Sequence, residues 1–153
     1  MAMQAATRQR LGGAFLNSLP LSSRDAREWA GYQFDMAADR LPEPEAWAVL
    51  GRDEAATLLL VAGDWIFTLT RKPLAATGLD SLEIVVASYP VRITAVRYRR
   101  QDLRTFWDFE FRWREALSIE GQINYRARPE DQETFDQPEA LARALARRAG
   151  WAA

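Results

Sequence analysis

The chain contains no cysteine and no histidine among its 153 residues. These absences exclude disulfide bonds, thiol nucleophiles, thiolate or imidazole metal sites and histidine general bases. A Ser-His-Asp or Cys-His hydrolase is therefore impossible for this sequence, and no cofactor or metal is expected. Lysine is almost lacking as well, because Lys72 is the single lysine among 20 basic residues. A GC-rich genome produces this bias without any functional cause.

An excess of charge of one sign is also lacking, since 20 basic residues face 21 acidic ones. No global field therefore attracts nucleic acid or an anionic membrane. No run approaches the roughly 18–20 apolar residues of a membrane span. Arg8 and Arg10 precede only a short apolar stretch, which Gly12 and Gly13 interrupt, so we expect a mature N-terminal helix or arm rather than a signal peptide. These features predict a soluble, cytoplasmic protein.

The length and the 48% content of hydrophobic residues predict one compact folded unit. Residues 22–40 have the pattern of an amphipathic helix, with Ser22 or Ser23 as N-cap. The residues that follow helical spacing are Trp29, Ala30, Gln33, Phe34, Ala37 and Leu41. Pro42 and Pro44 end this helix. We therefore expect an N-terminal helical arm, 1–41, and a sheet domain, 45–151, within one compact unit. The apolar residues of the arm could pack on this domain or on a neighbouring chain; they are Leu11, Phe15, Leu16 and Leu19.

From residue 46 onward the hydrophobic period is near two, which is typical of strands. Strands are expected over 46–50, 57–62, 65–70, 82–87, 91–98, 105–114 and 117–125, and a loop over 72–81. Gly63-Asp64 between two β-rich runs predicts a hairpin. In 105–114 the aromatic side chains alternate with charged ones, so one face of that strand should be buried. Pro138, acidic residues and Gly150 delimit a closing helix over 138–148.

The predicted order is a leading helix, about seven strands and a closing helix. Residues 57–70, 89–98, 105–113 and the run DQPEALARALARRAGW carry a pattern that resembles a bacterial pleckstrin-homology-like domain over about residues 45–151. This resemblance implies an α+β fold in which a strongly bent antiparallel sheet, or partly open barrel, is closed by the C-terminal helix. It implies docking or membrane targeting as function and supplies no catalytic residue. A cupped sheet with a helix in its mouth, as in lipid-binding and polyketide-cyclase-like proteins, is the alternative.

Two acidic residues form the one candidate for catalysis. Asp108 and Glu110 are two apart on an expected strand, so they share a face, as an acid/base pair or a cation site requires. Arg112 and Arg114 continue the same face. Cross-strand ion pairing explains this arrangement without catalysis.

A local basic segment is the candidate for anion binding. Residues 91–114 carry seven Arg against three acids, and residues 115–139 carry seven acids against two Arg. Arginine interleaved with aromatic residues can hold phosphates and stack on bases, but the two adjacent segments can also neutralise each other. The candidate binding residues are Arg97, Arg99, Arg100, Arg104 and Arg112, together with Trp47 and Trp151, which are expected to be exposed near element ends.

Taken together, the sequence favours a non-catalytic protein-binding or assembly module. The expected partner is another protein or a second copy of the chain. A binder of an anionic ligand or nucleic acid through residues 91–114 is the alternative, and a histidine-free enzyme that uses Asp108 or Glu110 is the second alternative.

Overall fold

The computed structural model describes the backbone of residues 2–21, 23–51, 56–73, 82–93, 95–100, 106–112, 116–122 and 129–150. Its helices are α1 (Ala5–Ser18), α2 (Arg24–Ala38) and α3 (Pro129–Arg148). Its strands are β1 (Ala46–Leu50), β2 (Thr57–Ala62), β3 (Trp65–Pro73), β4 (Leu82–Pro90), β5 (Ala95–Arg100), β6 (Phe106–Arg112) and β7 (Ala116–Gln122). The α+β class with antiparallel sheet and terminal helices is therefore confirmed.

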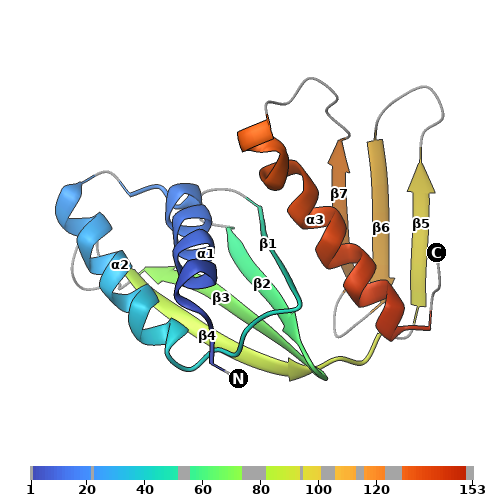
Figure 1. The fold of residues 1–153 in the computed structure, drawn as a ribbon, viewed down its shortest axis with the longest axis horizontal. Helices are drawn as coiled ribbons and strands as arrows, with labels where there is room; N and C mark the ends of the chain where they lie inside the picture. The colour runs from blue at the N-terminus through green and yellow to red at the C-terminus, as the bar shows by residue number, and fades with distance from the viewer. Residues whose placement is uncertain are drawn as a thin grey trace.

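A four-stranded antiparallel sheet in the order β1-β2-β3-β4 forms the centre of the molecule. Helices α1 and α2 cover one of its faces, whereas α3 and the β5-β6-β7 ladder pack on the other (Figure 1). The side chains of β2 alternate between two hydrophobic cores. Leu58 and Leu60 pack in the core on the α1 and α2 side, and Leu59 and Val61 pack in the core on the α3 side. A strand that is buried on both faces has a continuous apolar run, as residues 58–61 do.

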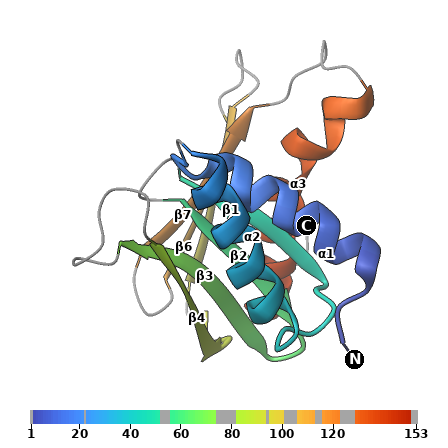
Figure 2. The same ribbon diagram turned by 90° about the vertical axis from the view of Figure 1, so that its left-hand side faces the viewer.

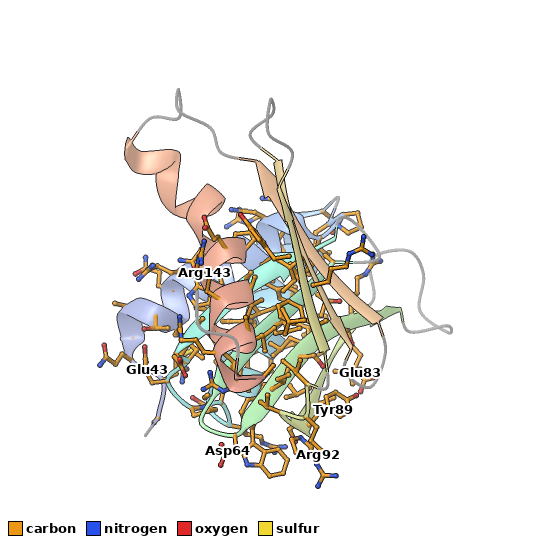
Figure 3. The ribbon with its side chains drawn as sticks, turned by 90° about the vertical axis from the view of Figure 1, so that its right-hand side faces the viewer. Glu43, Asp64, Glu83, Tyr89, Arg92 and Arg143 are labelled. Atoms are coloured by element: carbon orange, nitrogen blue, oxygen red, sulfur yellow. The ribbon has the colours of Figure 1, made fainter. Side chains whose placement is uncertain are left out.

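The expected single, strongly bent sheet is not what the structure has. The described strands form two separate ladders, and the sheet does not close. The four-stranded ladder ends after β4, where Val91 donates its N–H to the carbonyl of Asp64 at 2.8 Å, one residue beyond the pairing of Trp65 with Pro90. Asp64 and Arg92 lie together at this end of the molecule (Figure 3). The chain therefore passes to the second ladder here instead of bending one continuous sheet.

The N-terminal helix α1 packs on its own chain. Leu11 and Phe15 are fully buried and Leu19 nearly so, in a core shared with Trp47, Leu58 and Leu60. A glycine permits α2 to come close, since a Cβ added at Gly12 would lie 2.9 Å from the Phe34 ring. The N-terminal segment is thus part of this fold and is not a free arm, which the sequence alone left open.

The local signals that delimit α2 and the first hairpin are confirmed. The Ser23 side chain accepts a hydrogen bond from the N–H of Ala26 at 3.0 Å, as an N-cap does. Gly63 has φ +57°, a left-handed conformation that favours glycine, and Ala62 pairs with Trp65 across the turn. Both features depend on neighbouring residues alone, so the sequence is sufficient to predict them.

The closing helix begins earlier than predicted. α3 starts at Pro129, and Pro138, which was expected in its first turn, lies inside it. Pro129 and the two acids after it make an equally good helix start, because proline tolerates the first turn and acids complement the helix dipole. At its other end Arg148 donates to the carboxylate of Glu45 and to the carbonyl of Gly63. The hydrogen bond and charge of Arg148 hold the pKa of Glu45 below its usual value.

Candidate protein-binding surface

Three large apolar side chains on α2 are exposed to solvent. Trp29 is 48% exposed, Tyr32 58% and Met36 53%. Their spacing of three and four residues places them in one row along the helix. The Trp29 and Tyr32 rings stack, with centroids 5.9 Å apart and an interplanar angle of 22°. We call these three residues the α2 stripe.

The opposite face of α2 supplies its packing. Ala26, Ala30, Phe34 and Ala37 are buried against the sheet and α1. The helical spacing of the sequence predicts that Trp29 shares this face, and this prediction is wrong. Because 100° separates successive residues, Trp29 lies on the flank of the row that contains Ala26, Ala30 and Phe34. The helix therefore has two apolar faces, of which one is satisfied by the fold.

The outer edge of β4 adjoins the α2 stripe; no other described strand pairs with it, and we call it the open edge. β4 is the terminal strand of its sheet, with β3 as its neighbour. The Gln33 side chain accepts a hydrogen bond from the N–H of Ile84 at 2.7 Å, so this N–H is directed away from β3. Bonding alternates along an antiparallel ladder, and Val86 and Ser88 therefore also direct their backbone groups outward. Val86 is 38% exposed.

Gln33 places the stripe and the edge on the same side of the molecule. It follows Trp29 by four residues and precedes Met36 by three, so all three side chains are neighbours on the helix surface. Since Gln33 bonds to β4, the stripe lies on the side of α2 that is toward β4. Figure 2 shows α1 and α2 in front of the sheet and β4 at its margin. An apolar helix row and an open strand edge thus form one surface.

A groove of about 490 Å³ lies on the other side of α2, between α1 and α2. Gly12, Gly31 and the Phe34 side chain line it, and Arg8 and Asp35 stand among the polar lining residues. Arg8 is already paired with Asp39, with 2.6 Å between nitrogen and oxygen. In the described part of the chain no group of three or more acidic residues is suited to a metal ion. We therefore interpret it as an ordinary surface groove between two packed helices.

The structure changes the interpretation of the tryptophan candidates. Trp47 is only 9% exposed and belongs to the core beneath α1, so the exposure expected for it is wrong. Alternation explains its burial, because Trp47 and Val49 face α1 whereas Ala46 and Ala48 face α3. Trp151 lies outside the described residues.

The arginine candidates are placed mainly by strand register. Arg97 is exposed on β5 and stands opposite Glu110, and Arg99 stands opposite Asp108. Arg100 and Arg112 have strand positions opposite Trp107 and Ala95. Arg104 lies outside the described residues. The register thus sets basic positions directly across from the two acids, which is the arrangement for cross-strand neutralisation.

Two features of the surface are absent from the predictions made from the sequence. The spacing of Trp29, Tyr32 and Met36 was a sufficient signal for a second apolar row on the helix. The other feature is Arg71, whose Nε and Nη1 atoms are buried without a hydrogen-bond partner among the described residues. Arg71 pairs with Ile84 in the ladder, so it shares the apolar, helix-covered face of the sheet. Leu69 is buried on this face, and strand alternation places Arg71, two residues later, on the same face. The sequence therefore contains a signal for this buried charge.

Comparisons with known proteins assign no family to the chain. No family model, curated protein or solved structure matches it. Among the helices that the structure describes, none is long and apolar enough to cross a membrane. The function must therefore be argued from the surface itself.

Proposed function

We propose that the chain is a non-catalytic protein-binding or assembly module, and that the α2 stripe with the open edge of β4 is its binding surface. The observation that carries this proposal is the row of three half-exposed apolar side chains on a helix whose other face already packs in the core. Contiguous apolar side chains in solvent mark interaction sites. Tryptophan, tyrosine and methionine are also enriched in the cores of protein interfaces.

The adjacent strand edge supports the same function. Val86 and Ser88 offer outward backbone groups that an extended segment of a partner can pair with, while the stripe offers apolar contact. The two alternatives have less support. Opposite charges stand across from each other on β5 and β6, which favours neutralisation over anion binding or acid/base catalysis by Asp108 and Glu110. Cytoplasmic location and the likeness to a pleckstrin-homology-like domain stay predictions.

Affinity capture from a lysate of the native host tests the proposal. The bait is the full chain, and nuclease is added so that partners held by nucleic acid are lost. We expect a stoichiometric protein partner with the unmodified chain and its loss with Tyr32→Glu, because a carboxylate placed in an apolar interface core must be desolvated. The readout is quantitative mass spectrometry.

Trp65 supplies the matched control. It is 48% exposed, as Trp29 is, but it lies at the start of β3, next to the Gly63-Asp64 turn. Trp65→Glu should therefore retain the partner. Loss of the partner with both variants would indicate non-specific adhesion through exposed aromatic residues, and retention with both would remove the α2 stripe from the proposal.

A further inference from the structure

Arg71 is a charged residue that the fold places among apolar side chains. Its Nε and Nη1 atoms are buried, and neither atom has a hydrogen-bond partner among the described residues. Its ladder partner is Ile84, which packs against the core beneath α1 and α2. Gln33 of α2 bonds to the N–H of this same Ile84 at 2.7 Å, so the helix passes close to the position. Two of the three guanidinium nitrogens are therefore withdrawn from water.

Acidic side chains of the described chain are engaged or lie elsewhere. Glu83 directly precedes Ile84 on β4, so strand alternation directs it to the opposite face of the sheet. Asp35 lines the groove between α1 and α2. Other acids are held by partners in the chain, namely Glu28 by Arg24, Asp39 by Arg8, Glu43 by Thr7, Glu45 by Arg148 and Glu139 by Arg143. None of these carboxylates compensates the buried charge of Arg71.

We infer that Arg71 is a binding site for an oxyanion, a phosphate or carboxylate group that reaches it from solvent. A guanidinium presents paired N–H groups that match two oxygens of either group. Arg71 is only partly buried, so the site is open to such a ligand. An uncompensated buried charge is costly, and an anion that binds it therefore stabilises the folded state. Arg97 differs, because the acid Glu110 stands opposite it in the ladder.

Thermal unfolding of the full chain in a series of inorganic phosphate concentrations tests this inference. Phosphate replaces chloride at constant ionic strength, so the screening of surface charges stays the same. We expect the melting temperature to rise by about 3 °C when phosphate is tenfold above its Kd. A parallel series with acetate distinguishes the two ligand groups, because the anion that fits the site gives the larger rise.

Substitutions of Arg71 separate anion binding from general effects of salt. Arg71→Met removes the charge and keeps a long apolar side chain, so it should melt at least as high as the unmodified chain in chloride and show no rise with either anion. Arg71→Lys keeps a charge without the planar fork and should lose most of the rise. Arg92→Met is the matched control, because Arg92 is exposed at the end of β4 and projects from the molecule (Figure 3). It should keep the full rise.

Three results would overturn the inference. An equal rise in the unmodified chain and in Arg71→Met would mean that phosphate acts as a general stabilising salt. The absence of any rise in the unmodified chain would mean that neither anion binds. A melting temperature of Arg71→Met well below that of the unmodified chain in chloride would mean that the guanidinium is already compensated. The proposed binding surface does not include Arg71, so capture of a partner through the α2 stripe is an independent result.

Discussion

Phe15→Ala is expected to lower the free energy of unfolding by about 3–5 kcal/mol, the range for removing a buried aromatic side chain from a core. Phe15 is fully buried, and its ring centroid lies 6.4 Å from that of Phe34. The cavity would open at the junction of α1, α2 and the sheet, where Leu58 and Leu60 also pack. Because Gly12 is already in close contact with Phe34, the helices have little freedom to collapse into the space.

Urea denaturation at low protein concentration measures this effect. Tyr32→Ala is the matched control, since it also removes an aromatic ring but one that is 58% exposed. We expect its cost to stay within about 1 kcal/mol. Equal, small losses for both variants would contradict the conclusion that α1 belongs to the core and would return the first helix to the status of a separable arm.

Leu145→Ala is expected to lower the free energy of unfolding by about 2–5 kcal/mol. Leu145 is fully buried on α3, in the core that includes Val61 and Ile66 of the four-stranded sheet and Phe111 and Ile119 of the other ladder. The side chain therefore contributes to the packing of three layers at once. We expect the loss to appear in the cooperative unfolding of the whole chain.

Ala140→Gln is the control for Leu145→Ala, because Ala140 is exposed on the same helix and glutamine keeps the helix propensity high. Its effect should lie within about 0.5 kcal/mol. Thermal unfolding followed by far-ultraviolet circular dichroism compares the two variants. A loss below about 1 kcal/mol for Leu145→Ala would mean that α3 is not a structural link between the sheets.

Features that depend on neighbours in the chain could be predicted from the sequence. The hairpin at Gly63-Asp64 needs a glycine that tolerates positive φ, and the α2 start needs a side chain that caps at Ser23. Both were identified correctly. The burial of Phe111 on an alternating strand was also predicted, because period two alone determines which side chains share a face.

Features that depend on contacts distant in sequence could not be predicted. Whether Leu11 and Phe15 pack on their own sheet is decided by Trp47 and Leu58, which follow much later in the chain. The sheet divides into two ladders because β5 pairs with β6 and not with β4, and this choice of partner depends on residues distant in sequence. The exposure of Trp29 is also a tertiary result, because it depends on which face of α2 packs on the sheet and α1. For this reason the candidate surface lies on α2 and not on the basic strands that the sequence favours.

The absence of cysteine makes the central claim directly testable by thiol labelling. Tyr32→Cys and Ala140→Cys each introduce a single thiol at an exposed helical position. Each chain receives a short pulse of maleimide, once as a purified sample at high dilution, where self-association is lost, and once after incubation in host lysate, and labelling is quantified on the recovered chain by mass spectrometry. If the α2 stripe is a binding surface, position 32 becomes several-fold slower to label in lysate while position 140 keeps its rate. Equal labelling of position 32 in both conditions would contradict the account.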